Sequence, residues 1–245
     1  MGRLLEAVRR VPRGLRRRRA AEAPAPSGLL PSLPTAASYG ACLLAGLAIV
    51  AWAPLELAFA YQIAWRLAST IYLSVALTRE KRRRDLAGAG ARFARFSRNA
   101  AFTINNDAIA LVVLCLATRG TLPVEGPLWI PLAVGGALIA LGLGMKAWAA
   151  RSLGYRNYYC RDFFLPPERR EACRRGPYAF LRNPMYTVGY AHAYGFALLT
   201  LSWPGLLGAL FCQAAMLAFW ALVECPHVNR LYGRPGELRA TSGTR

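Results

Sequence analysis

The segment Arg182-Asn183-Pro184 contains the residues with the clearest chemistry in this sequence. Asn can cap the free N–H groups of a helix and Pro fits the first helical turn, so a helix is predicted to begin here. The N-terminus of such a helix attracts an anion, and the planar guanidinium of Arg182 can bind a carboxylate or phosphate through two hydrogen bonds. The segment therefore predicts an anion-binding site, with an ordinary capped helix at a membrane interface as the alternative.

Glu224 is a second candidate, because it lies where a long apolar stretch ends, just before Pro226. A carboxylate at the C-terminus of a helix opposes the helix dipole. We therefore expect a cationic ligand, a ligand hydroxyl or a nearby Arg to compensate it, with a solvated interfacial Glu as the alternative. For His192, within an apolar run, a hydrogen bond between helices is favoured over catalysis. The candidates for a general base are Asp162, Glu224, Tyr178 and His192.

Aromatic and small residues add weaker signals. A cluster of four aromatic residues could surround a cation or form an interfacial aromatic belt: Tyr158, Tyr159, Phe163 and Phe164. Gly142 and Gly144 form a G-x-G that favours close helix packing, although it could leave room for a flat ring. The six Cys show no C-x-x-C spacing and there are only two His, so the sequence predicts no metal site.

Long apolar runs must position these groups. Hydrophobic residues make up 55% of the chain, and the charges collect between the runs. Runs that are apolar on all sides are typical of helices in lipid, so we predict an all-α, polytopic transmembrane bundle. Because about 20 apolar residues cross a bilayer, about six spans are expected, at 37–53, 57–78, 100–118, 127–150, 185–201 and 203–223.

The basic residues predict the orientation. The net charge is +19, and all Lys and Arg except Arg66 and Arg119 fall in residues 1–35, 79–98, 146–184 and 224–245. Positive residues stay on the cytoplasmic side, so both termini and these segments are predicted to be cytoplasmic. No nucleic-acid-binding signature accompanies the charge, which favours a membrane over nucleic acid as the partner. The Arg- and Ala-rich composition favours a bacterial inner membrane.

The remaining segments have simpler predicted roles. Arg66 falls inside the second span, so it is either functional or paired with Glu56 or a backbone carbonyl. Segment 79–98 is expected to be a loop or an interfacial helix that uses Phe93 and Phe96. The predicted organisation is a disordered basic tail over 1–35, a transmembrane hairpin with its basic loop over 36–98, a bundle that carries the site over 99–233, and a polar tail over 234–245.

Three motifs resemble those of the integral-membrane methyltransferases, the group that contains phosphatidylethanolamine N-methyltransferases and isoprenylcysteine carboxyl methyltransferases. The resemblance covers about residues 130–233, and Asn183 is more similar to the phospholipid branch, since His is the alternative there. The strongest motif is similar to G-P-Y-x-x-x-R-[HN]-P-x-Y. The motifs are Gly176-Pro177-Tyr178 with Arg182-Asn183-Pro184-Met185-Tyr186, then Gly142-x-Gly144, then Glu224-Cys225-Pro226-His227.

This resemblance implies S-adenosylmethionine as cofactor, in a pocket at the cytoplasmic face between the last helices. It also implies a membrane lipid or lipidated acceptor, in the first place an amine head group such as that of phosphatidylethanolamine. The implied catalytic residues are Glu224, Tyr186 and Asp162. The implied cofactor-binding residues are Gly142, Gly144, Tyr178, Arg182, Asn183, Pro184, Tyr186, Glu224 and His227.

Three alternatives stay open. An isoprenylcysteine-type carboxyl methyltransferase would use the same cofactor with a carboxylate acceptor. An NADPH-dependent sterol-type reductase would share an R-x-P-x-Y-like element. A non-catalytic membrane scaffold is supported by two departures from the family pattern, because Cys225 replaces the second Glu of an E-E pair and the tail after Gly233 is atypical.

Overall fold

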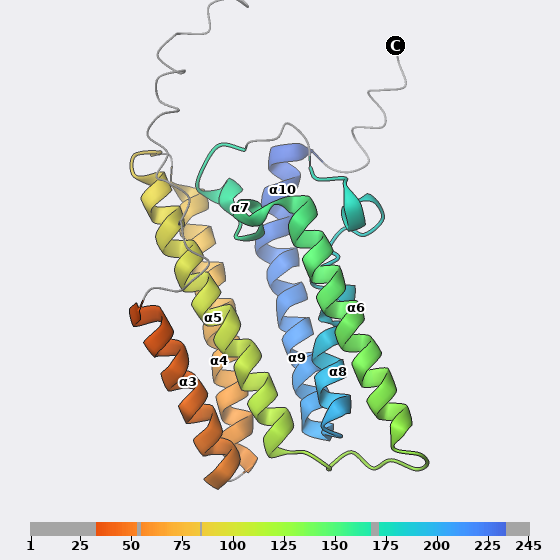
Figure 1. Ribbon diagram of the computed structural model, residues 1–245. Helices are drawn as coiled ribbons and strands as arrows, with labels where there is room; N and C mark the ends of the chain where they lie inside the picture. The colour runs from red at the N-terminus through yellow and green to blue at the C-terminus, as the bar shows by residue number, and fades with distance from the viewer. Residues whose placement is uncertain (1–32, 53–54, 84, 168–171, 234–245) are drawn as a thin grey trace, which may run out of the picture.

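The computed structural model describes residues 33–52, 55–83, 85–167 and 172–233, and the regular elements among these residues are all helical, as predicted (Figure 1). Residues 1–32 and 234–245 of the predicted tails, and Pro54 at the predicted first break, lie outside the described residues. The bundle consists of α3 (Leu33–Trp52), α4 (Leu55–Arg82), α5 (Ala89–Ala117), α6 (Trp129–Leu153), the short α8 (Ala191–Leu199) and α9 (Trp203–Phe219).

Three helices among the described residues are long and apolar enough to cross a membrane. They are α5, α6 and the continuous helix Trp203–Tyr232 that begins with α9. With a rise of about 1.5 Å per residue, each exceeds the roughly 30 Å of bilayer hydrocarbon. By contrast, α8 has nine residues and is only about 13 Å long. The protein is therefore an integral membrane protein, and the prediction that 185–201 forms one full-length span is wrong.

The predicted helix start at Asn183 is also wrong, because the chain turns there. The carbonyl of Asn183 accepts hydrogen bonds from the backbone N–H and the hydroxyl of Thr187, at 3.2 and 2.6 Å. The N–H of Gly189 then bonds to the carbonyl of Pro184 at 2.8 Å. A 3₁₀ turn, η4 (Val188–Tyr190), follows before α8 begins. The Thr187 N–H bond joins residues four apart, as in an α-helix, but the Gly189 N–H bond joins residues five apart, so the α-helical pattern is interrupted before α8. The predicted capping bond of Asn183 is present, because its Oδ1 accepts a 3.2 Å hydrogen bond from the N–H of Tyr186.

Segment 79–98 is not a loop or an interfacial helix, because α4 and α5 both extend into it. Lys, Arg and Ala are good helix formers, and basic residues at the end of α4 complement its dipole. An ion pair of 2.7 Å between Arg92 and Glu80 joins the two helices. Phe96 is buried and packs on Phe164, with ring centroids 5.0 Å apart. The basic residues thus extend a helical hairpin beyond its apolar part.

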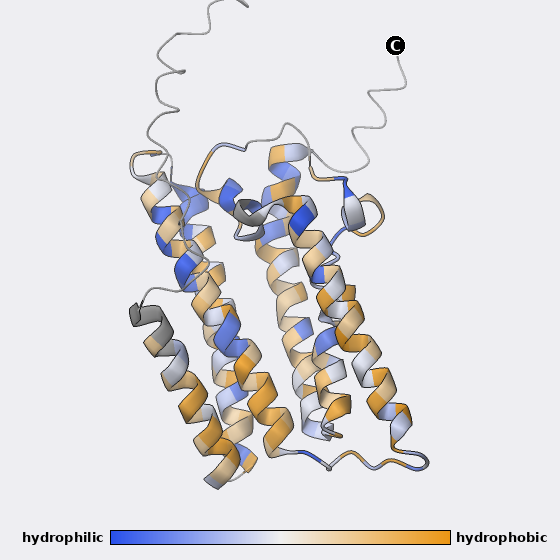
Figure 2. Cartoon of the chain, in the orientation of Figure 1, coloured by the Kyte–Doolittle hydropathy of each residue, from blue (hydrophilic) through white to orange (hydrophobic). Residues whose placement is uncertain are grey.

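Close packing of α6 on α8 depends on glycine. A Cβ at Gly195 would lie 2.5 Å from the carbonyl oxygen of Gly135, and a Cβ at Gly142 would lie 2.3 Å from the backbone nitrogen of His192. Such approaches are typical of helix pairs in membranes. The opposite face of α6 exposes large apolar side chains such as Trp129 and Leu141, as expected toward lipid. Hydrophilic residues gather instead at the end of the bundle near α7 (Tyr155–Tyr158) and α10 (Cys225–Tyr232) (Figure 2).

Arg66 pairs with Asp107 on α5, and not with Glu56 or a carbonyl as predicted. Its guanidinium also donates a 2.6 Å hydrogen bond to the hydroxyl of Tyr190. Arg66 and Asp107 are both only 4% exposed. A buried ion pair needs this kind of added hydrogen bond, because both charges have lost their hydration.

Candidate active site

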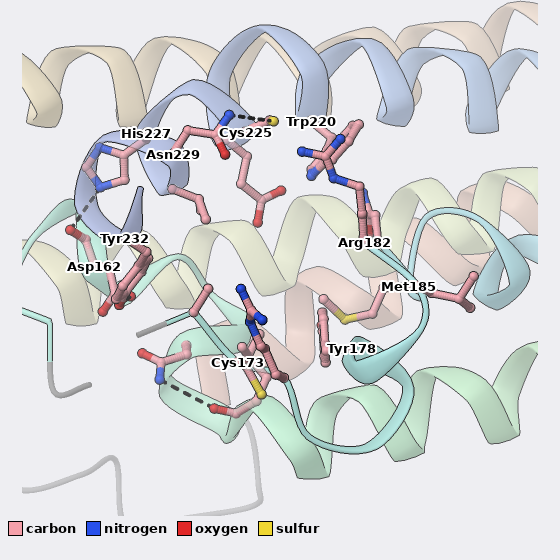
Figure 3. A pocket seen from close by; sticks show the side chains of 18 of the residues that line it. Asp162, Cys173, Tyr178, Arg182, Met185, Trp220, Cys225, His227, Asn229 and Tyr232 are labelled. Atoms are coloured by element: carbon pink, nitrogen blue, oxygen red, sulfur yellow. Dashed lines mark hydrogen bonds between the residues drawn. The ribbon is translucent and has the colours of Figure 1, made fainter. Parts of the chain in front are cut away.

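A pocket of about 570 Å³, here called the outer pocket, lies at the hydrophilic end of the bundle (Figure 3). The segments between α6 and α8 form one wall, and the end of the Trp203–Tyr232 helix forms the other. This volume is within the usual range for small-molecule sites. The predicted site residues that line it are Asp162, Tyr178, Arg182, Asn183, Glu224 and His227.

Glu224 is presented by a turn of π-helix, η5 (Trp220–Glu224), between α9 and α10. The N–H of Cys225 bonds to the carbonyl of Trp220, five residues earlier. The next residue, Pro226, has no N–H and its ring would collide with the carbonyl four residues before it, so a regular α-helix cannot continue here. Short π turns of this kind are frequent at functional sites. In this chain the turn brings both Trp220 and Glu224 to the outer pocket.

Asp162 is held by two residues of α10. One carboxylate oxygen accepts a 2.6 Å hydrogen bond from the hydroxyl of Tyr232. Its backbone carbonyl lies 3.1 Å from Nε2 of His227, whose ring stacks on Phe163 with centroids 3.7 Å apart. Asp162 lies in a short 3₁₀ turn, η2 (Arg161–Phe163), so these contacts join the segment after α6 to the end of the chain's last described helix. His227 thereby positions the carboxylate.

The motif segment from Gly176 to Tyr186 is fixed by turns. It begins with a 3₁₀ turn, η3 (Gly176–Ala179), in which Gly176 has φ +57° and a Cβ would lie 2.2 Å from Oγ of Ser152, so only glycine fits. Farther on, Oδ1 of Asn183 accepts a 3.2 Å hydrogen bond from the N–H of Tyr186. The Asn183 side chain is buried and lines the outer pocket.

The outer pocket is lined by residues with buried polar atoms that have no hydrogen-bond partner among the described residues. Buried polar groups are normally paired, and unpaired groups cost free energy, so a cluster of them indicates a missing ligand or water. Two are carboxylate oxygens, on Glu224 and Asp162, and one is the amide nitrogen of Asn183. The others are the hydroxyl of Tyr178 and the amide oxygen of Asn157. The outer pocket thus offers both hydrogen-bond donors and acceptors to a ligand.

Two side chains of the outer pocket stay protonated. Burial raises the pKa of the Cys160 thiol, and the nearby Glu224 carboxylate raises it further. The thiol lies 4.0 Å from Oε1 of Glu224 and acts as its weak donor. Burial likewise raises the pKa of Tyr178, whose phenol is therefore a donor and not a base in the resting protein. The carboxylates and the imidazole of His227 are the remaining bases of this pocket.

Comparison with known proteins identifies the matching part of the chain. Residues 130–235 match a family model described as phospholipid methyltransferase. This segment, here called the phospholipid methyltransferase segment, is similar to that family. It contains all three sequence motifs and every predicted site residue.

Relatives of the phospholipid methyltransferase segment are much longer proteins. A phosphatidylethanolamine N-methyltransferase of Phaeosphaeria nodorum is 39% identical over 110 residues, which is 45% of this chain and 12% of the relative. Proteins with the same name from Clavispora lusitaniae and Talaromyces marneffei are 32% and 36% identical over 44% and 42% of this chain, and 13% and 10% of their own lengths. These relatives are fungal, which gives the predicted bacterial membrane no support. No solved structure matches the chain.

Not all predicted residues of the phospholipid methyltransferase segment reach the outer pocket. Gly142 faces α8, and Gly144 is exposed, so that a Cβ added there would meet no other atom within 4 Å. Pro184 is fully buried in the turn. Tyr186 lines a second cavity, described below, which also contains His192, and His192 makes the predicted hydrogen bond between helices, 3.3 Å from Lys146 Nζ on α6.

Of the two alternatives for the aromatic cluster, the cage around a cation does not form, because its members separate. Phe163 lines the outer pocket, whereas Tyr158 lines the second cavity. Phe164 packs into the core against Phe93 and Phe96. The chain passes through tight turns here, with Cys160 at φ +55°, so neighbours in sequence point to different spaces.

Sequence reasoning missed three residues of these spaces. Cys160 and Trp220 line the outer pocket without belonging to any motif. Lys146 falls among the predicted cytoplasmic basic residues, but it lies in α6 and lines the second cavity. An ammonium within an apolar run was the available signal, as it was for Arg66.

Proposed function

We propose that this chain transfers a methyl group from S-adenosylmethionine to the amine of a phospholipid head group, such as that of phosphatidylethanolamine. The observation that carries this proposal is the cluster of unpartnered donors and acceptors in the outer pocket, within the phospholipid methyltransferase segment. The names of the relatives favour an amine acceptor over a prenylcysteine carboxylate, a sterol reduction or a scaffold role.

The pocket residues fit the polar groups of this cofactor. S-adenosylmethionine supplies an activated methyl group on a positively charged sulfur, together with an ammonium, a carboxylate, ribose hydroxyls and a flat base. Glu224 and Asp162 offer carboxylate oxygens for its ammonium or hydroxyls. Arg182 and the Asn183 amide offer donors for its carboxylate. Trp220 gives an aromatic surface for its base.

A lipid amine must lose its proton before it can accept a methyl group, because its pKa is near 10, as for Lys. Enclosure in the pocket favours the neutral amine. Glu224 and Asp162 each have an oxygen that can take the proton. We assign this role to Glu224, because Asp162 is already held by Tyr232 through its other oxygen. Positioning of the amine by the surrounding residues supplies the remaining part of the rate acceleration.

We also place the outer pocket at the cytoplasmic face, with both termini on that side. The support is the concentration of hydrophilic residues at the pocket end of the bundle (Figure 2), together with the many basic residues that the sequence places in segments 79–98 and 146–184. Basic segments stay on the cytoplasmic side of a membrane.

The direct test is calorimetric titration of the full-length protein in detergent with S-adenosylmethionine, and with NADPH as the control ligand. We expect saturable binding of S-adenosylmethionine, weakened about tenfold or more in Glu224→Ala, which loses a charge-assisted hydrogen bond. Transfer of labelled methyl to phosphatidylethanolamine in vesicles, and not to a prenylcysteine peptide, would establish the acceptor. Folded protein that ignores S-adenosylmethionine would overturn the proposal, and binding of NADPH in its place would indicate a reductase.

A further inference from the structure

A second cavity of about 130 Å³, here called the inner cavity, lies between the α4–α5 hairpin and the α6–α8 pair. Met185 lines both this cavity and the outer pocket, so the two spaces are neighbours. The inner cavity combines an apolar wall with a polar lining. The polar lining consists of Arg66, Asp107, Lys146, Tyr190 and His192, with Tyr158 and Tyr186 toward the outer pocket.

The inner cavity carries one excess positive charge. Arg66 and Asp107 neutralise each other. Among the described residues, no carboxylate lies within ion-pair distance of Lys146. Its ammonium instead lies 3.3 Å from Nε2 of His192 and 5.3 Å from the ring centroid of Tyr190. Nδ1 of His192 lies 2.7 Å from the carbonyl of Gly189 and donates to it, so Nε2 is a neutral acceptor for the ammonium.

The fold directs this charge inward. Lys146 belongs to α6, whose other side faces lipid, and a long Lys side chain can usually extend along the protein surface to water. Here its stem passes Gly189, where a Cβ would lie 3.1 Å from Cγ of Lys146. The ammonium then ends in the cavity next to the Arg66 ion pair. An unpaired ammonium in an apolar interior is costly, and an anion in the cavity would relieve that cost.

We propose that the inner cavity binds the phosphate of the phospholipid acceptor, with Lys146 as its counter-ion. This inference rests on the proposed function and names a second subsite for its substrate. Because Lys146 lies seven residues before the end of α6, it is about 10 Å deeper than Leu153, which lines the outer pocket. In a bilayer the phosphate likewise lies deeper than the amine, so the amine would point toward the outer pocket. Ala108 lines the inner cavity and is exposed on α5, so we place the entry of the lipid on this side.

The test measures binding of short-chain lipids to the full-length protein in detergent, for the wild type, Lys146→Met and Lys146→Arg. The lipids are phosphatidylethanolamine, phosphatidic acid, which keeps the phosphate without the amine, and diacylglycerol, which has neither. We expect Lys146→Met to weaken both phosphate lipids about tenfold or more, because it removes a charge-assisted contact. Lys146→Arg should retain most of the affinity, and diacylglycerol should bind all three proteins alike.

Several results would overturn the inference. Unchanged affinity of Lys146→Met for both phosphate lipids would exclude the subsite, and an effect on phosphatidylethanolamine alone would place the amine there. Efficient competition by millimolar inorganic phosphate would indicate a site for the free anion. S-adenosylmethionine binding, measured on the same proteins, shows that Lys146→Met is folded. A wild type that binds phosphate lipids through Lys146 but neither binds S-adenosylmethionine nor transfers methyl would refute the proposed function and leave the anion site standing.

Discussion

The outer pocket and the inner cavity both contain carboxylates, but in the part of the chain that the structure describes only that of the inner cavity has an ion-pair partner. In the outer pocket, Glu224 and Asp162 each keep a buried oxygen without a partner among the described residues, and no cation forms an ion pair with them there. In the inner cavity, Asp107 is paired with Arg66, and the unmatched charge is the ammonium of Lys146. The outer pocket, which also contains Arg182, therefore favours a ligand with both positive and negative groups, whereas the inner cavity favours an anion.

The ion pair of the inner cavity also has a structural role. The Arg66–Asp107 pair joins α4 to α5, and Tyr190 extends it to the phospholipid methyltransferase segment. Helices α4 and α5 lie outside that segment, yet they complete the inner cavity. We infer that α4 and α5 are part of the substrate site and not only a membrane anchor.

The largest effect is expected at the outer pocket. Glu224→Gln keeps the shape of the side chain but removes the proposed base, and should lower the methyl transfer rate roughly 10²–10⁴-fold. Asp162→Asn should lower it much less, because that carboxylate is held by Tyr232 and serves binding. Single-turnover rates at saturating S-adenosylmethionine measure both. Equal losses in the two variants would contradict the assignment of Glu224.

Thermal stability should be lowered by a change in the inner cavity and hardly at all by Glu224→Gln, in contrast to the methyl transfer rate. Asp107→Ala leaves the Arg66 guanidinium buried without its carboxylate, and should cost about 3–5 kcal/mol of stability. Glu224→Gln should cost little, since one carboxylate oxygen has no partner among the described residues, the other accepts a weak thiol contact from Cys160, and the amide of Gln can still accept hydrogen bonds. Thermal unfolding in detergent compares them. The double variant Arg66→Met with Asp107→Leu should recover most of the loss, and failure to recover it would show that the pair does more than neutralise charge.

Arg182 tests the donor side of the outer pocket. Arg182→Ala should weaken S-adenosylmethionine binding about tenfold, because a guanidinium–carboxylate contact is lost. Arg151→Ala is the matched control, since Arg151 is an exposed basic residue on α6 that does not line the pocket. Calorimetric titration distinguishes a local contact from a general effect of positive charge, which both variants would share.

The smallest effect is expected at Ser202, which is remote from both cavities. Its hydroxyl accepts a 2.8 Å hydrogen bond from the N–H of Gly205 and caps α9. Ser202→Ala should cost about 1–2 kcal/mol of stability. It should leave the affinities for cofactor and lipid unchanged, as measured by the same titrations. A change in either affinity would show that mild destabilisation alone perturbs the cavities, and would weaken the conclusions drawn from the other variants.

The sequence alone predicted the features that depend on residues close together in the chain. Apolar runs predict the all-α fold and the approximate positions of α3, α4, α5, α6 and α9, because lipid requires each span to satisfy its own backbone hydrogen bonds. The motif around Arg182 and the Glu224 element predict most of the charged and polar lining of the outer pocket, since turns and a proline fix these side chains within a few residues. The π turn itself was not predicted, although Pro226 is its local cause.

Only the tertiary structure decided which distant residues meet. Arg66 could pair with several groups by sequence, and packing of α4 on α5 selects Asp107. Lys146 could belong to a cytoplasmic segment by its charge, but α6 and Gly189 direct it into the bundle. Periodicity shows which residues share a helix, whereas the rotation and depth of one helix against another depend on side-chain packing across the whole bundle. The inner cavity, built from residues 66–216, is therefore a property of the fold and not of any motif.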